Sequence, residues 1–311
     1  MVLRCWGIKI IETRIGKLRL KNPTILASGI LGVTKASLLN VAQNGAGAVT
    51  MKSVSREPRK GHSNPILLTY EAGMMNAVGY SNPGIEDAKR EFTGLKDVGV
   101  PVIASIIGTE PKDFSLVREI DPKEFSAVEI PLSCPHTPGF GLLAGQGTPE
   151  ATSRITKIVK KNTRLPVIVK LSPNIPAMGK VCRAAEKAGA DAINMGNTHG
   201  PGMVINIETA EPVLDFRIGG VSGPAIRPIA VRCVYDVYES AKIPIIGCGG
   251  VQTGRDAVEM IMAGASAVGI GTGIYYRGID VFSKVCDEME KIMVKNSYNS
   301  IKDMRGAAHE R

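Results

Sequence analysis

The sequence predicts an α/β protein, a (β/α)8 TIM barrel with an N-terminal β-hairpin that caps the bottom of the barrel. Three observations support this prediction. Eight short β-rich runs alternate with helical patterns along the 311 residues. Several of these runs are apolar at nearly every position, as expected of parallel strands buried on both faces. Polar residues and glycines gather where the runs end, which is where such barrels carry their functional residues.

The predicted elements follow one another without a linker, so we expect a single domain over residues 1–311. The hairpin is predicted within residues 1–20, where polarity alternates around a turn at Ile15-Gly16-Lys17. The barrel strands are predicted at 24–27, 46–53, 100–106, 127–133, 167–171, 192–197, 245–249 and 267–271. Helices are predicted at 35–43, 85–95, 149–161, 177–188, 228–240, 254–263 and 281–294. The polar tail, 295–311, is expected to fray.

Composition argues against several classes of protein. No run of about 18 apolar residues occurs, so no membrane-spanning helix is expected, and the N-terminus lacks a signal-peptide profile. The six cysteines show no C-x-x-C spacing, which predicts no metal site, reduced thiols and a cytoplasmic location. The net charge of +9 comes from basic residues spread along the chain without interleaved aromatics. This pattern favours solvated faces over a nucleic-acid surface.

The segment 127–139 carries the sharpest chemical signal. An apolar run ends in Ser133-Cys134-Pro135-His136, and a glycine-rich loop, 139–147, follows it. Pro135 must end the strand because it has no N–H and a fixed φ. A strand end can fix a thiol while a loop closes over it, so Cys134 is a candidate catalytic residue. The alternative interpretation is a small buried residue at a strand end.

Glycines at the last two barrel strands predict a phosphate site. Gly249 and Gly250 follow the seventh strand, Gly271 and Thr272 follow the eighth, and Gly223 lies in a third glycine-rich loop. Glycine lets backbone N–H groups approach an anion closely, and the following helix would add its positive end. Loops after strands seven and eight are also the usual phosphate site of such barrels. The alternative is tight turning between strand and helix.

Two lysines suggest which phosphate compound is bound. Lys52 and Lys170 each end an apolar strand, where a charge is costly unless it is functional or paired. A cation near the pyrimidine edge of an isoalloxazine ring would stabilise the anionic reduced flavin, so a flavin is expected. The alternative is an inward ion pair with a carboxylate such as Glu129.

From about Leu20 to Gly273 the chain resembles the class 1 dihydroorotate dehydrogenases, most closely the archaeal and NAD-linked (1B) catalytic subunits. The resemblance lies in the order and spacing of several motifs. These are Asn22-Pro-Thr-Ile-Leu-Ala-Ser-Gly29, Lys52-Ser53, Gly73-Met-Met-Asn-Ala-Val-Gly-Tyr-Ser-Asn-Pro-Gly84, Ser133-Cys-Pro135, Val169-Lys-Leu-Ser-Pro-Asn174, Asn197-Thr198, Gly219-Gly-Val-Ser-Gly-Pro-Ala-Ile-Arg-Pro228 and Ile246-Gly-Cys-Gly-Gly-Val251.

The resemblance implies an FMN-dependent oxidoreductase that oxidises dihydroorotate to orotate in de novo pyrimidine biosynthesis. Cys134 matches the base that removes the C5 proton while hydride passes from C6 to flavin N5. The substrate-binding positions match Lys52, Asn76, Ala77, Val78, Gly79, Tyr80, Asn197 and Thr198. The flavin contacts match Ser28, Lys52, Ser53, Lys170, Gly223, Gly249, Gly250, Gly271 and Thr272. For Asn76 the alternative is turn chemistry.

Three residues depart from the family pattern. Pro131 stands where the family usually has an asparagine that binds flavin and substrate, so one anchor is missing. His136 replaces a frequent asparagine and can still donate a hydrogen bond, and Ser105 replaces a frequent flavin-contacting asparagine. The Ser-Cys-Pro-His sequence also resembles the flavin domain of dihydropyrimidine dehydrogenase, which acts on uracil and thymine. The matched segments 73–84 and 219–228 favour dihydroorotate.

Two hypotheses from other classes stay open. One is a non-redox barrel enzyme acting on a phosphorylated metabolite, with Lys170 as a Schiff-base or general-base lysine. The other is a catalytically silent barrel within a complex, for which Pro131 is the only support. The family resemblance further implies a homodimeric core and a second subunit, carrying FAD and an iron–sulfur cluster, that completes a heterotetramer. Cysteine as the base argues against the quinone-linked membrane class.

Overall fold

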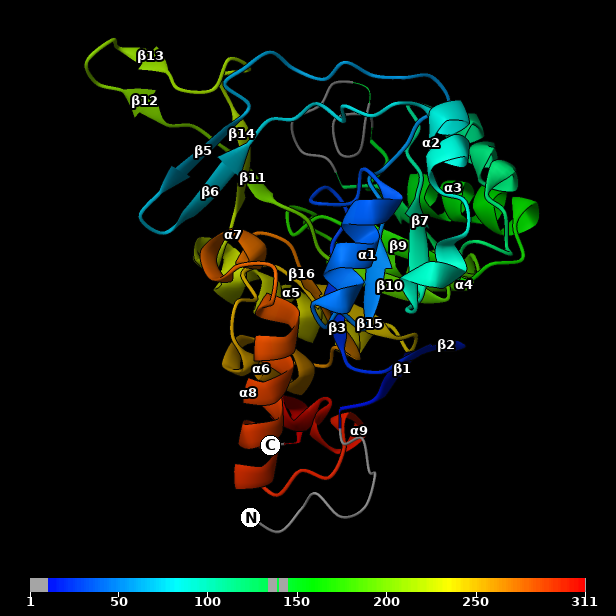
Figure 1. Ribbon diagram of the computed structural model, residues 1–311, viewed down its shortest axis with the longest axis vertical. Helices are drawn as coiled ribbons and strands as arrows, with labels where there is room; N and C mark the ends of the chain where they lie inside the picture. Colours follow the sequence, from blue (N-terminus) through cyan, green and yellow to red (C-terminus); the bar gives the residue numbers. More distant parts are fainter. Residues whose placement is uncertain (1–10, 134–138, 140–144, 311) are drawn as a thin grey trace.

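The computed structural model describes residues 11–133, 139 and 145–310. Parallel strands close into a barrel at the centre of the molecule, with helices around it (Figure 1). In order around the barrel these are β10 (Ala192–Met195), β15 (Ile245–Cys248), β16 (Ala267–Ile270), β3 (Thr24–Leu26), β4 (Ala48–Thr50), β7 (Val102–Ser105), β8 (Ala127–Pro131) and β9 (Val167–Leu171). Each lies within a strand predicted from the sequence, so the (β/α)8 prediction is confirmed.

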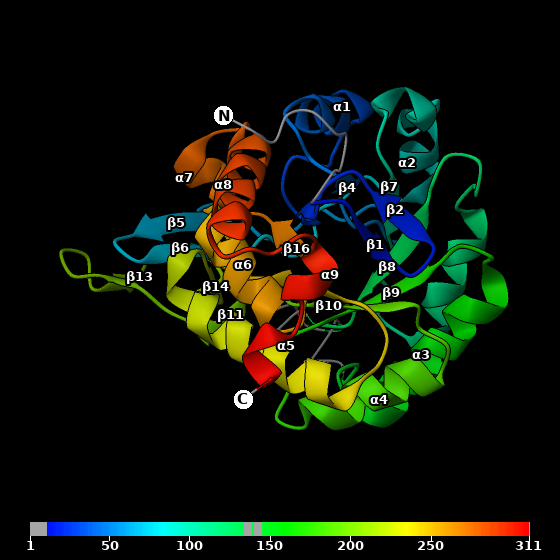
Figure 2. The same ribbon diagram turned by 90° about the horizontal axis from the view of Figure 1, so that it is seen from below.

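The predicted hairpin is confirmed where it is described. β1 (Thr13–Ile15) pairs with β2 (Leu18–Leu20) in antiparallel register, and Gly16 supplies the positive φ of +58° that the turn requires. Seen from below, the hairpin lies across the end of the barrel (Figure 2). Its apolar side chains pack on the lowest layer of the barrel interior, which consists of Ile25, Ala48, Ile103, Ala127, Ile168, Ala192, Ile246 and Ala267. The hairpin therefore caps the bottom of the barrel.

Helices cover the outside of the barrel, and their ends follow local sequence signals. They are α1 (Lys35–Gln43), α2 (Ile85–Glu91), α3 (Pro149–Asn162), α4 (Met178–Lys187), α5 (Arg227–Ser240), α6 (Gly254–Met262), α7 (Gly273–Arg277) and α8 (Val281–Lys295), with 3-10 turns at η1 (Leu95–Val98) and η4 (Pro224–Ile226). α3 begins after Thr148, whose hydroxyl accepts from the N–H of Ala151, and has proline in its first turn. The connection between β7 and β8 was not predicted as helical and forms the 3-10 helix η2 (Pro111–Glu119).

A second sheet, which the sequence did not predict, lies beside the top of the barrel (Figure 1). Its antiparallel strands run in the order β11 (His199–Gly202), β14 (Gly219–Ser222), β6 (Gly73–Asn76) and β5 (Leu67–Tyr70). A short hairpin, β12 (Ile205–Asn206) with β13 (Glu211–Pro212), projects beyond it. Pairing of Gly220 with Asn76 joins two distant segments that both carry predicted site residues.

The C-terminal tail differs from the expectation that it would fray. α9 (Ile301–Met304) and η5 (Ala307–His309) pack on the barrel, with the side chains of Ile301 and Met304 buried. Nη1 of Arg305 donates to Oγ of Ser266 at 3.0 Å, and the ring of His309 stacks on Tyr235. Two apolar residues three positions apart are enough to anchor a single helical turn that is otherwise polar.

Candidate active site

A cavity of about 280 Å³ opens at the end of the barrel where the parallel strands terminate. Predicted site residues from eight separate segments of the chain line this cavity. Predicted residues that line it are Ser28, Lys52, Ser53, Asn76, Val78, Gly79, Tyr80, Lys170, Asn197, Thr198, Gly223, Gly249, Gly250, Gly271 and Thr272. Ala77 is fully buried and is not part of the lining. Cys134, Pro135 and His136 lie outside the described residues.

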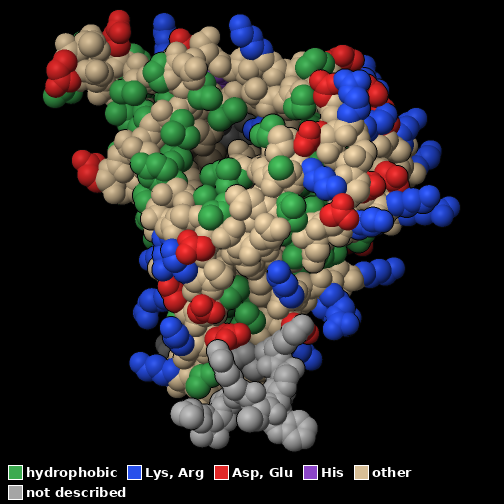
Figure 3. Space-filling model, viewed as in Figure 1, with side chains coloured by type: hydrophobic (Ala, Val, Ile, Leu, Met, Phe, Trp, Pro, Cys, Tyr) green, Lys and Arg blue, Asp and Glu red, His purple; other side chains and the backbone are tan. Residues whose placement is uncertain are grey.

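The surface of the molecule is hollowed in its upper half, where hydrophobic side chains and a basic side chain gather (Figure 3). Elsewhere on this face lysine and arginine side chains are dispersed and mixed with acidic ones (Figure 3). The basic excess of the chain is therefore not concentrated in a patch on this face, as expected for solvated charges.

The floor of the cavity holds a buried charged cluster. Lys170 on β9 and Glu129 on β8 are 4% and 1% exposed, and their charged atoms, Nζ and Oε1, are 3.8 Å apart. The hydroxyl of Ser28 bridges them, since it accepts from Nζ of Lys170 at 3.0 Å and donates to Oε1 of Glu129 at 2.8 Å. Nδ2 of Asn194 on β10 donates to the other carboxylate oxygen at 2.6 Å. The ion pair that sequence analysis kept as an alternative is present, and Lys170 still lines the cavity.

Lys52 is the second cation of the cavity. Burial lowers the pKa of its ammonium below the ordinary lysine value of 10.5, and the charge of Lys170 lowers this pKa further. No hydrogen bond or ion pair to its side chain is found within the described part of the chain. The charged side chains among the described lining residues are these two lysines, so the cavity favours an anionic ligand.

The glycine-rich loops present unpaired backbone donors. Within residues 11–133, 139 and 145–310, the N–H groups of Gly249, Gly250, Gly271 and Thr272 have no hydrogen-bond partner. Gly250 is buried and the other three are partly buried at the cavity lining, so these four donors are available to a ligand and suit the oxygens of a phosphate. The N-terminus of α6 does not contribute as expected, because carboxylates of the protein already bind the N–H groups of residues 252–254.

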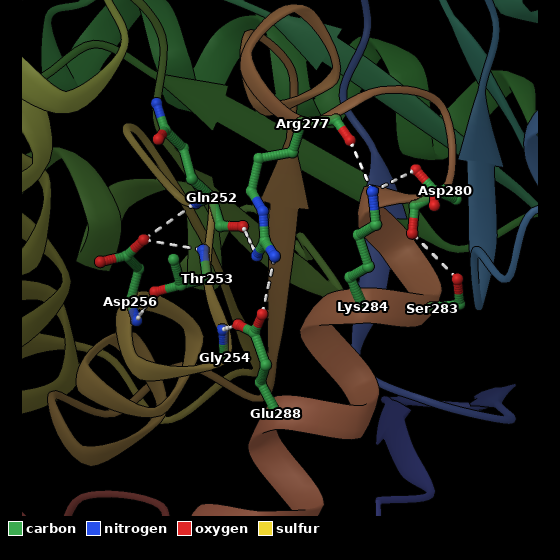
Figure 4. A network of polar contacts seen from close by, with 9 residues as sticks. All are labelled: Gln252, Thr253, Gly254, Asp256, Arg277, Asp280, Ser283, Lys284 and Glu288. Atoms are coloured by element: carbon green, nitrogen blue, oxygen red, sulfur yellow. Dashed lines mark hydrogen bonds and ion pairs between the residues drawn. The ribbon is translucent and has the colours of Figure 1, made fainter.

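A polar network of residues outside the cavity lining connects the loop after β15 with the segment after β16 (Figure 4). Glu288 on α8 accepts from Nη2 of Arg277 at 2.8 Å through one oxygen, and from the N–H of Gly254 at 2.6 Å through the other. Nη1 of Arg277 donates to the carbonyl of Gln252 at 2.9 Å. Arg277 ends the short helix that follows Thr272, so Glu288 and Arg277 together hold the loop after β15 against the segment after β16.

The second sheet and β10 form the opposite wall. Nδ2 of Asn197 donates to Oγ of Ser133 at 2.8 Å, and Oδ1 of Asn197 accepts from the N–H of Thr198 at 2.8 Å. Thr198 packs against Gly220, where any Cβ would collide with the threonine side chain. The loop 76–80 turns through two consecutive residues with positive φ, Gly79 at +71° and Tyr80 at +57°. Such a turn directs successive N–H groups to one side.

The departures from the family pattern have clear places. Pro131 is buried, ends β8 opposite Lys170, and lines the cavity without a side-chain donor. Ser105 is fully buried behind the lining, where its hydroxyl lies 2.8 Å from that of Ser53. Sequence reasoning missed Asn194, which is a buried polar residue inside an apolar strand, and that contrast was the available signal.

The described residues contain no group of histidine, cysteine or acidic side chains that could hold a metal ion. Cys248 lines the cavity, and burial raises the pKa of its thiol above the ordinary value, so this thiol is suited to packing rather than to proton abstraction. None of the helices in residues 11–133 and 145–310 has the length and apolar character needed to cross a membrane.

Comparisons with known proteins agree with these features. The family model described as dihydroorotate dehydrogenase matches residues 10–293. The relative named dihydroorotate dehydrogenase B (NAD(+)), catalytic subunit, from Methanothermobacter thermautotrophicus is 45% identical over 302 residues, which are 97% of this chain and 99% of the relative. Proteins with the same name from Methanocaldococcus jannaschii and Pyrococcus abyssi are 40% and 42% identical, over 98% and 96% of this chain and 100% and 99% of their own lengths.

Proposed function

The chain belongs to the dihydroorotate dehydrogenase family, and on that premise we propose that it is a catalytic subunit that uses FMN to oxidise dihydroorotate to orotate. The family consists of flavin-dependent oxidoreductases of pyrimidine biosynthesis that act on a CH–CH bond. One observation carries the proposal for this chain. Two lysines and a cradle of unpaired backbone N–H groups meet in one cavity at the end of the barrel.

FMN fits the two ends of this cavity. The unpaired N–H groups of Gly249, Gly250, Gly271 and Thr272 would bind its phosphate, and Gly223 completes this end of the lining. Ser28, Ser53, Lys52 and Lys170 would face the isoalloxazine ring. When bound, the flavin supplies the acceptor for the hydride that leaves C6 of the substrate.

The substrate would bind between Lys52 and the wall formed by Asn76, residues 77–80 and Asn197-Thr198. Dihydroorotate carries a carboxylate, and Lys52 is a partly buried cation to which no described residue supplies a counter-ion. The amides of Asn76 and Asn197 can both donate to and accept from the polar edge of a pyrimidine. The anchor lost at Pro131 leaves these groups to orient the ring.

Cys134 is the proposed base that removes the C5 proton of the substrate. It lies outside the described residues, and the support comes from the sequence motif. It follows Ser133 directly in the chain, and Ser133 is hydrogen bonded to Asn197 of the cavity wall. A thiol with an ordinary pKa of about 8.5 can act as such a base when its surroundings stabilise the thiolate.

We also propose that a second subunit receives the electrons. The relatives are named catalytic subunits, and that name supports the existence of a partner. A partner with FAD and an iron–sulfur cluster, bound to a homodimer of this chain, is the form that the NAD-linked class of the family implies.

The deciding experiment is anaerobic titration of the purified protein, followed by its visible spectrum. Flavin absorbance that is bleached by dihydroorotate, and not by dihydrouracil, would support the proposed substrate. Bleaching by dihydrouracil alone would transfer the activity to uracil-type substrates, and bleaching by neither would overturn the substrate assignment. A colourless preparation that cannot be reconstituted with FMN would overturn the assignment of the cofactor.

A further inference from the structure

The carboxylate of Glu129 is a buried charge that the proposed reaction does not use. It is 1% exposed, beneath the cavity floor, and is not itself part of the lining. Both of its oxygens accept hydrogen bonds, from Ser28 and from Asn194, which is the pattern of an ionised carboxylate. A buried charge of this kind persists only where it is paired, and its partner here is Lys170 at 3.8 Å.

The charges around the cavity do not cancel. Lys52 and Lys170 are the charged side chains among the described lining residues, and Glu129 is the carboxylate paired with Lys170. The cluster therefore carries one net positive charge beside any ligand that enters. Loss of the Glu129 charge would act strongly on a bound ligand, because Glu129 and Lys170 are both buried away from water.

We propose that Glu129 is the counter-charge that sets the reduction potential of the bound flavin: it holds Lys170 through Ser28 and offsets one of the two lysine charges. Glu129 does not touch the cavity, so it is a positioning and tuning residue rather than a catalytic one. This inference rests on the proposed binding of FMN. With the full charge of both lysines, the anionic reduced flavin would be stabilised further and would return its electrons less readily.

The hydrogen bonds of the cluster make a clean test possible. In Glu129→Gln the shape is kept and the charge is lost. Oδ1 of Asn194 is buried and has no partner among the described residues. A flipped Asn194 amide can therefore accept from the new Gln side chain, while Ser28 donates to the Gln oxygen. The double variant Glu129→Gln with Asn194→Asp moves the carboxylate from β8 to β10 and retains a hydrogen bond between the two side chains.

The measurement is the two-electron reduction potential of FMN in the holoprotein, without substrate. We expect Glu129→Gln to favour reduced over oxidised FMN by at least about tenfold, which is an upward shift of about 30 mV. The double variant should recover at least half of that shift. Glu124→Gln is the matched control, because Glu124 accepts from the N–H of Leu95 and lies outside the cavity lining. Its potential should equal that of the wild type.

An unchanged or lowered potential in Glu129→Gln, or an equal shift in Glu124→Gln, would overturn the proposal. If Glu129→Gln does not bind FMN, the double variant is the deciding test. A reduction potential near that of the wild type in the double variant would show that the buried charge matters. A misfolded double variant would show that Glu129 is only structural, which would overturn the proposal. Failure of the proposed function would give a different result. If the protein did not use FMN, the wild type itself would bind none. The identity of the pyrimidine substrate does not affect this measurement, which is made without substrate.

Discussion

Replacing Glu288 by glutamine should weaken FMN binding, although Glu288 lies outside the cavity lining. The carboxylate accepts from Arg277 at 2.8 Å and from the N–H of Gly254 at 2.6 Å (Figure 4). Glutamine keeps one acceptor and presents an NH2 group to the other donor. A hydrogen bond to a charged group contributes about 1.5–3 kcal/mol. The Glu288 and Arg277 side chains are 33% and 27% exposed, so screening by water reduces the loss to about 1–2 kcal/mol.

If the loops after β15 and β16 bind phosphate only in this arrangement, that loss appears in the affinity. It corresponds to a dissociation constant for FMN raised about 5- to 30-fold. The assay is fluorescence titration of the apoprotein with FMN, together with its thermal unfolding. Glu290→Gln, an exposed position on the same helix, is the control for the change in charge. Unchanged FMN affinity in Glu288→Gln, or equal weakening in Glu290→Gln, would refute this account of the network.

The destabilisation caused by Glu288→Gln should also depend on pH. Burial raises the pKa of Glu288, but hydrogen bonds from Arg277 and Gly254 outweigh it, so the pKa lies below the ordinary value of 4.5. A carboxyl whose pKa is lowered by folding contributes stability above its unfolded pKa and loses it as the pH falls through the folded pKa. The difference in free energy of unfolding between wild type and Glu288→Gln should therefore be constant above about pH 5 and become smaller in acid.

Three further predictions follow from single residues. Because burial lowers the pKa of Lys52, affinity for orotate should fall at an alkaline pH below the usual lysine value of 10.5. In Lys52→Arg, which stays charged, equilibrium titration should show no such fall. Gly220→Ala should displace Thr198 and raise the KM for dihydroorotate about tenfold, by lost binding of about 1.4 kcal/mol, while FMN affinity is unchanged. Met304→Ala should lower the free energy of unfolding by about 2–4 kcal/mol in denaturant titrations, because Met304 is fully buried, whereas Lys302→Ala at an exposed position should be neutral.

The barrel could be predicted because its strands are locally recognisable. Strands such as β9 are buried at every position, so their sequence is continuously apolar apart from Lys170. The second sheet had no such signal. β6 and β14 are short and glycine-containing, and they become strands only because Gly220 pairs with Asn76 across a large separation in sequence. Pairing between distant segments is set by tertiary structure, which local patterns do not report.

In the candidate site, too, some residues could be recognised from the local sequence and others only from the tertiary structure. Lys170 stood out as a charge at the end of an apolar strand, and Glu129 was recognised as one possible partner. The sequence offered these as alternatives, whereas the register of β8 with β9 allows both: Lys170 lines the cavity and is paired beneath it. Asn194 lies opposite Lys170 in the pairing of β10 with β9. Its place as a polar residue in an apolar strand marks it as unusual, but only this register identifies Glu129 as its partner.

The charges also bear on the choice between dihydroorotate and a neutral pyrimidine. Lys170 has a carboxylate partner, but Lys52 has none among the described residues, and a ligand that displaces water from this partly buried ammonium without pairing with it is costly. Uracil or thymine in the cavity would leave that charge uncompensated, whereas the carboxylate of dihydroorotate would pair with it. The phosphate of FMN would not compete for Lys52, because the N–H groups at Gly249, Gly250, Gly271 and Thr272 provide a separate cradle. The missing asparagine at Pro131 removes an anchor of the ring but leaves this selection by charge intact.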